Sequence, residues 1–219
     1  MKEGKNNTVL LTVIGIATLL VAVVGATFAY FSAQLSGTEN QSTMTIQASN
    51  GGSSTLDGGQ AIVVKDIYPR DEAWVNKKIA VTYDNTTATS GTYDYNVGLH
   101  YTNGYQVVGS SYDIQYTITE GYCETHPEAV GSAACGTAGG TWYQNVTEQG
   151  TVTKQTATKT GIPAGTGDLA AIASGSINLP ANGVKHYYTL RIYFVNDPNR
   201  NQIQGAEFTA YVMTEQVNG

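Results

Sequence analysis

Polar and apolar residues alternate along most of the chain after residue 42, and a period of two residues predicts β-strands. The clearest example places Tyr93, Tyr95, Val97, Leu99 and Tyr101 on one face. The same spacing recurs within residues 43–48, 74–85, 112–118, 186–194 and 208–214. With turn residues between these runs, the pattern predicts an all-β fold of about eight or nine strands. An antiparallel two-sheet sandwich is expected, with jelly-roll topology favoured over an up-and-down barrel.

Two stretches break the alternation. Residues 121–140 are rich in small residues and are expected to be a loop inserted into the sandwich. Residues 162–175 are also expected to be a loop, with one short helical turn over residues 168–173. No other helix is expected within residues 43–219.

An uncharged apolar run from Thr8 to Phe31 precedes the β-rich region and follows a head that carries Lys2 and Lys5. About 20 apolar residues are enough to cross a bilayer as a helix. Small residues at Thr27 and Ala29 favour cleavage after Ala29, which makes Tyr30 the new N-terminus. A second candidate cut follows Ala33. The alternative is an uncleaved anchor with its basic head in the cytoplasm.

Composition narrows the choice of partners. Charged residues make up 13% of the chain and the net charge is −6, which argues against binding to nucleic acid or to anionic lipid. Contact with a membrane is therefore expected only through the apolar run, before cleavage. The chain has 15 Tyr and 4 Phe, and tyrosine suits sheet surfaces that are half buried and half hydrated. This composition favours association with copies of the same chain, although an ordinary extracellular β-domain would also have it.

The two cysteines, Cys123 and Cys135, both lie in the expected loop insertion. Outside the cytoplasm an even number of cysteines is expected to pair, so we predict a disulfide. It would close a loop of about 13 residues, worth about 3 kcal/mol in the chain-entropy model. The alternative is a metal site that adds His126, but three ligands without a clear fourth make a poor zinc site.

No constellation of catalytic residues stands out. The three histidines, His100, His126 and His186, do not form a metal-binding motif. Residues 164–168 lack the lysine that a phosphate-binding loop needs. We therefore predict no catalytic residue, no metal ion and no cofactor, and a protein that is not an enzyme.

Three segments resemble the TasA/camelysin family. The end of the apolar run, residues 24–31, resembles the family's signal-peptide end, with Thr27-Phe28-Ala29 as the triplet before the cut. A polar tail and a Thr-rich first strand, residues 42–48, follow as they do in that family. Residues 204–212 resemble its closing strand, whereas the cysteine-containing loop departs from it. The resemblance implies a secreted jelly-roll subunit of an extracellular fibre, of the kind found in bacterial biofilm matrix.

The resemblance also implies a mechanism of assembly. In that family the N-terminal tail leaves its own domain and completes a sheet of the next subunit, which is donor-strand exchange. An added strand gains main-chain hydrogen bonds, and its alternate side chains fill pockets. The expected organisation is a leader at 1–29, an extended donor tail at 30–42 and a sandwich at 43–219. The apolar residues available for docking are Tyr30, Phe31 and Leu35, with Met44 and Ile46 beyond.

One alternative to this mechanism stays open. The tail could be a linker, with Tyr30 and Phe31 as interfacial aromatic residues next to a retained membrane anchor. The protein would then be a membrane-anchored cell-surface binding domain, with a glycan as one possible ligand of its tyrosines and Trp142.

Overall fold

The chain divides into two compact units, Met1–Asn40 and Gln41–Gly219. The computed structural model describes residues 15, 16, 18, 43–47, 51–68, 70–104, 113–145, 147–195 and 204–217. In the first unit, Gly15, Ile16 and Thr18 are helical. Within the described residues, no helix combines the length and the apolar character that crossing a membrane requires. The predicted cleavage site and the tail lie outside the described residues.

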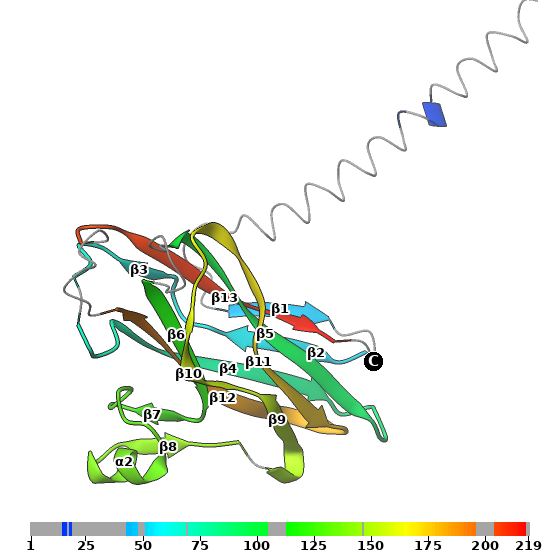
Figure 1. The fold of residues 1–219 in the computed structure, drawn as a ribbon. Coiled ribbons are helices and arrows are strands. Elements are labelled where there is room, and N and C mark those ends of the chain that lie inside the picture. Colours follow the sequence, from blue (N-terminus) through cyan, green and yellow to red (C-terminus); the bar gives the residue numbers. More distant parts are fainter. Residues whose placement is uncertain are drawn as a thin grey trace, which may run out of the picture. The chain divides into compact units, whose positions relative to one another are not determined.

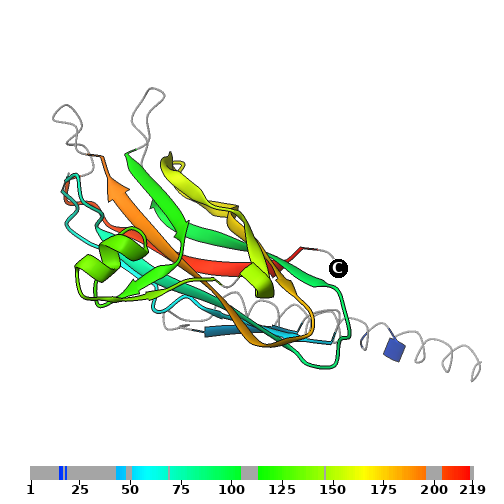
Figure 2. The same cartoon turned by 90° about the horizontal axis from the view of Figure 1, so that it is seen from below.

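The described part of the second unit is built almost entirely of antiparallel β-strands, as predicted (Figures 1 and 2). One sheet, sheet A, has the strand order β1 (Thr43–Gln47), β2 (Ser53–Asp57), β4 (Val75–Asn85), β12 (Ala181–Phe194), β6 (Ile114–Glu120), β10 (Thr156–Gly161). The other, sheet B, has the order β3 (Ile62–Val64), β13 (Phe208–Gln216), β5 (Thr92–Gly104), β11 (Gly165–Asn178), β9 (Gly150–Lys154). A short 3-10 helix, η1 (Thr147–Gln149), precedes β9.

The hydrophobic core lies between sheets A and B and follows the alternation of the sequence. All five residues of the period-two face on β5 are buried, as are Tyr188, Leu190, Ile192 and Phe194 on β12. Aromatic rings join the two sheets directly. Tyr83 of β4 stacks on Tyr93 of β5, with ring centroids 4.0 Å apart.

A buried polar network also crosses the core. His186 Nδ1 on β12 lies 2.7 Å from the Tyr95 hydroxyl on β5, which lies 2.8 Å from the Tyr188 hydroxyl. The Tyr188 hydroxyl also lies 3.5 Å from the Ser174 carbonyl, to which it donates. His186 is fully buried, and its Nε2 has no hydrogen-bond partner among the described residues.

The prediction of a loop with a helical turn in residues 162–175 is wrong, because β11 runs through this stretch. A bulge hides the strand from the sequence pattern. Leu169 and Ala173 on β11 are four positions apart in the sequence, whereas their partners on β5, Leu99 and Val97, are two positions apart. Extra residues of this kind shift the alternation. As a result Ile172 and Ala173 are both buried although they are adjacent.

The segment predicted as an inserted loop contains regular structure. Residues 121–145, called the ribbon module below, contain β7 (Tyr122–Glu124), the single turn-and-a-half of α2 (Ser132–Thr137) and β8 (Thr141–Tyr143). Among the strands that the structure describes, β7 and β8 pair with each other and with no other strand (Figure 1). A strand of three residues is too short for the alternation of polar and apolar residues to be recognised in the sequence.

The ribbon module is fixed to the outer face of sheet A by side chains of β12. Thr189 and Arg191 alternate with the core residues of β12 and so point outward, yet both are buried. The Thr189 hydroxyl donates to the Gly121 carbonyl at 2.6 Å. The Arg191 guanidinium donates to the carbonyls of Pro127 and Ala129 at 3.1 and 3.0 Å. The module therefore covers this part of the face.

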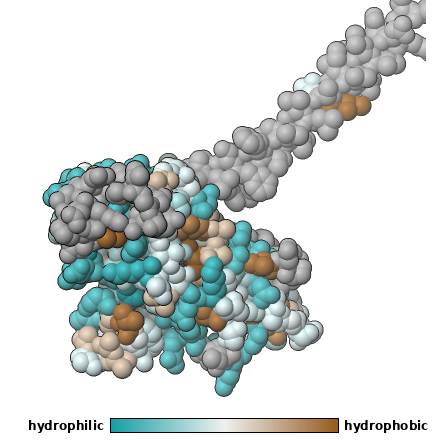
Figure 3. Space-filling view, viewed as in Figure 1, coloured by the Kyte–Doolittle hydropathy of each residue, from teal (hydrophilic) through white to brown (hydrophobic). Residues whose placement is uncertain are grey.

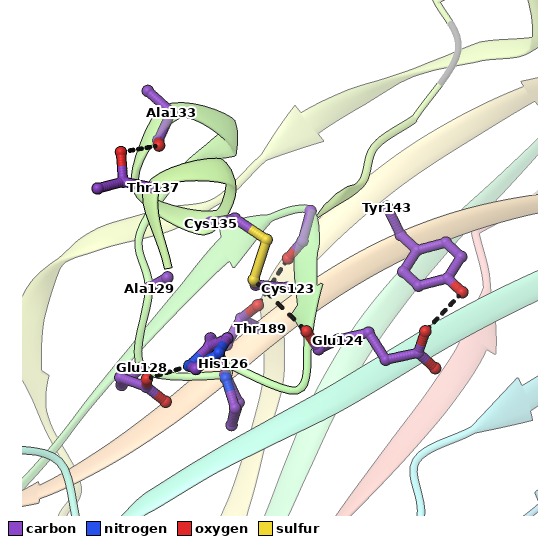
Figure 4. Close-up of a disulfide and its surroundings, with 12 residues drawn as sticks. Cys123, Glu124, His126, Glu128, Ala129, Ala133, Cys135, Thr137, Tyr143 and Thr189 are labelled. Carbon is purple, nitrogen blue, oxygen red and sulfur yellow. Dashed lines mark hydrogen bonds and ion pairs between the residues drawn. A yellow bond between two sulfur atoms is a disulfide. The ribbon is translucent and has the colours of Figure 1, made fainter. Parts of the chain in front are cut away.

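A disulfide between Cys123 and Cys135 joins β7 to α2, with the two Cα atoms 5.6 Å apart (Figure 4). Replacing both cysteines with alanine is expected to lower the free energy of unfolding by about 3 kcal/mol, because the unfolded chain regains the entropy of the open loop. Urea denaturation measures the change. Reduced wild-type protein should match the double variant, and a reductant should not affect the variant. Equal stability of the oxidised wild type and the variant would contradict this prediction.

Candidate functional site

The two lateral edges of the sandwich are built differently. On one side, β9 ends sheet B and β10 ends sheet A, and only Gln155 separates these strands in the chain. Residues 150–161 thus run continuously from one sheet into the other. This crossing joins the two sheets on one side of the sandwich, which is called the sealed edge below, and within the described residues β9 and β10 each pair with one neighbour.

The sealed edge also carries features that discourage pairing with a further strand. The pairing of β10 with β6 has a register shift between Thr156 and Thr160. Lys159 lies within this shift, and its amino group lies 4.3 Å from the centroid of the Tyr193 ring. On β9, the amino group of Lys154 donates to the Ala171 carbonyl. Bulges and lysines are typical of strands protected from edge-to-edge association.

The opposite side, called the open edge below, consists of β1 and β2 from sheet A and β3 and β13 from sheet B. The short strand β3 pairs only with Phe208–Ala210 of β13. Over Tyr211–Glu215, β13 pairs with β5 on one side and, within the described residues, with no strand on the other. This part of β13 contains no lysine, arginine or proline. It therefore presents main-chain groups to which another strand can bind.

Side chains at the open edge leave part of the core accessible. Val212 of β13 packs against the core but is only half buried. The connection from β2 to β3 passes beside Val212 at Gly58. A Cβ added to Gly58 would lie 3.4 Å from the Val212 Cβ, so the two residues are within van der Waals contact distance. On the outer face, Tyr211 stacks on His100 at 4.7 Å and stays 42% exposed. On the face drawn in Figure 3, apolar side chains form small separate patches between hydrophilic ones.

The structure places two of the predicted docking residues in the domain's own sheet. Met44 and Ile46 lie in β1, opposite Leu56 and Ser54 of β2 in the same chain. In a single chain they are therefore part of an edge strand of sheet A. The remaining predicted residues, Tyr30, Phe31 and Leu35, and the cleavage position at Ala29 lie outside the described residues.

The histidines and cysteines do not gather into a site. His100 pairs with Asp168 at 2.7 Å on the outer face of sheet B, and His126 pairs with Glu128 at 3.1 Å on the ribbon module. Both cysteines are joined in the disulfide, so their sulfur atoms are not free to bind a metal together with His126. In the part of the chain that the structure describes, no three His, Cys, Asp or Glu side chains form a group able to hold a metal ion.

The open edge of β13 was not identified from the sequence. The alternation of residues 208–214 predicts a strand, but it does not show whether a neighbour lies on one side or on both. The lack of lysine, arginine and proline in Tyr211–Gln216 is the signal that sequence reasoning missed, because edges exposed in a monomer usually carry such residues.

Comparison with known proteins gives no relative: no family model, no curated protein and no solved structure matches the chain.

Proposed function

We propose that the chain is a structural subunit of an extracellular filament. The N-terminal segment released by cleavage after Ala29 adds a strand to the open edge of the next copy, and repetition of this contact builds a head-to-tail polymer. The proposal places the chain with TasA/camelysin-like fibre proteins, secreted to the cell surface or the extracellular matrix. Its partners are other copies of itself, and it needs no cofactor and has no enzymatic activity.

The difference between the two edges supports this proposal most directly. A β-sandwich with two open edges can pair at random with many chains, whereas one sealed edge restricts pairing to the other side. At the open edge, Tyr211–Glu215 offers five consecutive residues for pairing, and the half-buried Val212 offers an apolar contact. Both are features that strand addition uses, the first for affinity and the second for specificity.

The composition of the tail suits this role. Residues 30–42 contain one charged residue, Glu39, and three large apolar residues: the adjacent Tyr30 and Phe31, and Leu35 after three small or polar residues. An extended segment of this kind can donate main-chain hydrogen bonds without burying many charges. A contact in which one end of a subunit binds the other end of the next does not close on itself unless the rotation allows a ring, and so it extends as a filament.

We also infer that the sandwich has jelly-roll topology. Apart from the β7–β8 pair, consecutive strands from β2 to β13 alternate between sheets A and B. The order β4-β12-β6-β10 faces the order β5-β11-β9, which supports the interleaved arrangement of a jelly roll. In this interpretation β1, β2, β3 and β13 are additions on the open edge, where we place assembly.

Electron microscopy of the native material and of purified mature chain tests the proposal. The mature chain, beginning at Tyr30, is expected to form filaments with a regular subunit repeat, and deletion of residues 30–42 is expected to leave monomers. The matched control is replacement of these residues with a Gly/Ser segment of equal length, which keeps the spacing but removes the apolar side chains. Filaments that persist in both variants would contradict a donor role for the tail.

A membrane-anchored cell-surface binding domain is the second candidate, favoured by the uncharged run from Thr8 to Phe31. Mass spectrometry of the native N-terminus separates the two. A chain that begins at Tyr30 supports the filament, whereas an intact N-terminal segment in membrane fractions supports the anchor.

A further inference from the structure

A cluster of aromatic side chains lies where the ribbon module meets sheet A. The amino group of Lys78, on β4, lies 5.5 Å from the ring centroid of Tyr122, 5.3 Å from that of Tyr143 and 5.5 Å from that of Tyr187. Tyr122 and Tyr143 are directly opposite each other in the β7–β8 pair, and Tyr187 belongs to β12. The shared cation–π contacts hold rings from the module and from the sheet close together.

Tyr143 and Tyr187 are in direct ring contact across this joint. Their centroids are 5.2 Å apart, and the ring planes are inclined by 41°. Two other tyrosine–tyrosine ring contacts occur in the described residues, Tyr83–Tyr93 and Tyr93–Tyr95, and their rings are buried in the core. The contact between Tyr143 and Tyr187 is the one whose two partners are both partly exposed to solvent.

The hydroxyl of Tyr143 has a base beside it. It donates a hydrogen bond to Glu124 Oε2 at 3.0 Å, and Figure 4 shows the two side chains extending toward each other from β8 and β7. Removing an electron from a phenol makes its hydroxyl proton strongly acidic. A carboxylate already hydrogen-bonded to that hydroxyl can accept the proton as the electron leaves, as a general base does in other proton transfers.

We propose that Tyr143 and Tyr187 are an oxidative cross-linking site at which a dityrosine bond joins the ribbon module to sheet A. The oxidant is hydrogen peroxide acting through a haem peroxidase. Each tyrosine loses one electron and its hydroxyl proton, and the proton of Tyr143 passes to Glu124. The two radicals form a carbon–carbon bond between ring positions next to the oxygens. The hydrogens on those carbons then return to the oxygens, so both phenols are restored. Overall, two tyrosines lose two hydrogen atoms, and one peroxide becomes two water molecules.

This bond would change how the module is held. In the structure it is joined to sheet A by hydrogen bonds from Thr189 and Arg191 and by the contacts of Lys78, while the disulfide lies within the module itself. A link between β8 and β12 would keep the module on the sheet even when these hydrogen bonds open. The reaction takes place within one chain and does not depend on polymerisation.

The test is treatment of dilute, full-length chain with a haem peroxidase and hydrogen peroxide, followed by reduction, proteolysis and peptide mass spectrometry. The wild type is expected to yield a peptide pair that joins residues 143 and 187 with the loss of two hydrogen atoms, while the chain migrates as a monomer on a denaturing gel. Tyr143→Phe and Tyr187→Phe are expected to lose this pair completely. Tyr211→Phe, which removes an exposed tyrosine elsewhere, is the matched control and should keep it.

Glu124→Gln tests the proton acceptor separately. It keeps a hydrogen-bond acceptor beside Tyr143 but removes the basic carboxylate, so the initial rate of cross-linking is expected to fall severalfold. Formation of links only between different chains, or an unchanged yield of intramolecular dityrosine in Tyr143→Phe, would overturn the site. An unchanged rate in Glu124→Gln would overturn the role of the carboxylate.

Discussion

Val212→Lys is expected to prevent filament formation while leaving the domain folded. In the filament that we propose, a strand added at Tyr211–Glu215 would cover the exposed half of Val212. A lysine at this position would place an ammonium group in that apolar contact, or force it out past the incoming strand. Loss of the contact and burial of charge together cost several kcal/mol. Because about 1.4 kcal/mol corresponds to a factor of ten in affinity, the critical concentration should rise on the order of 100-fold.

Val152→Lys is the matched control for this experiment. Val152 lies on β9 at the sealed edge and, like Val212, is a partly buried valine packed against the core. The two variants should lose similar free energy of unfolding in urea, but Val152→Lys should still form filaments. Sedimentation and electron microscopy measure assembly in both. Normal filaments from Val212→Lys, or equal loss of assembly in the two variants, would show that the open edge is not the receiving site.

In the wild type, the free energy of unfolding is expected to change by about 3 kcal/mol with pH because of His186, and His186→Phe is expected to abolish this change. Burial lowers the pKa of His186 from 6.5 to about 4. An unfolded chain binds a proton at this histidine near pH 6.5, whereas the folded chain does so only near pH 4. The free energy of unfolding is therefore at its full value above pH 6.5, falls as the pH decreases toward 4, and levels off below. The difference in pKa corresponds to about 3 kcal/mol.

The groups that contact His186 do not titrate in this range. Burial raises the pKa of both Tyr95 and Tyr188, so they stay protonated. Urea denaturation at several pH values between 4 and 7 measures the effect. The carboxylates contribute equally to the wild type and the variant, so the difference between the two curves isolates His186. Parallel curves for wild type and His186→Phe would contradict the prediction.

The sequence predicted the core strands well where side chains alternate without interruption. On β5 and β12 every second residue enters the core, so the periodicity alone identifies both the strand and its buried face. It failed on β11, where the extra residues between Leu169 and Ala173 change which face each side chain occupies. It also failed on β7 and β8, because three residues do not establish a period. The segment that contains these strands is held by the hydrogen bond from Arg191 to the Pro127 carbonyl and by the disulfide, and the local sequence pattern shows neither contact.

The candidate site was less predictable than the fold. Cys123 and Cys135 were expected to pair from their number and the expected export, and in the structure they are joined. The open edge depends on which strands are neighbours, and that is decided by pairings such as those of β13 with β3 and β5, far apart in the sequence. Met44 and Ile46 show the same limit, since their alternation fits a strand in the chain's own sheet as well as a strand given to a neighbour.

The continuous crossing of residues 150–161 from sheet B to sheet A has a consequence for the shape of any polymer. A monomer with one tail to give and one side able to receive has a valence of two. Material built from it would grow as threads without branch points, and its two tips would differ, one with an unused tail and the other with an unoccupied side. A tailless domain added in excess would still receive a neighbour's tail but could give none, so it should stop growth at one tip only.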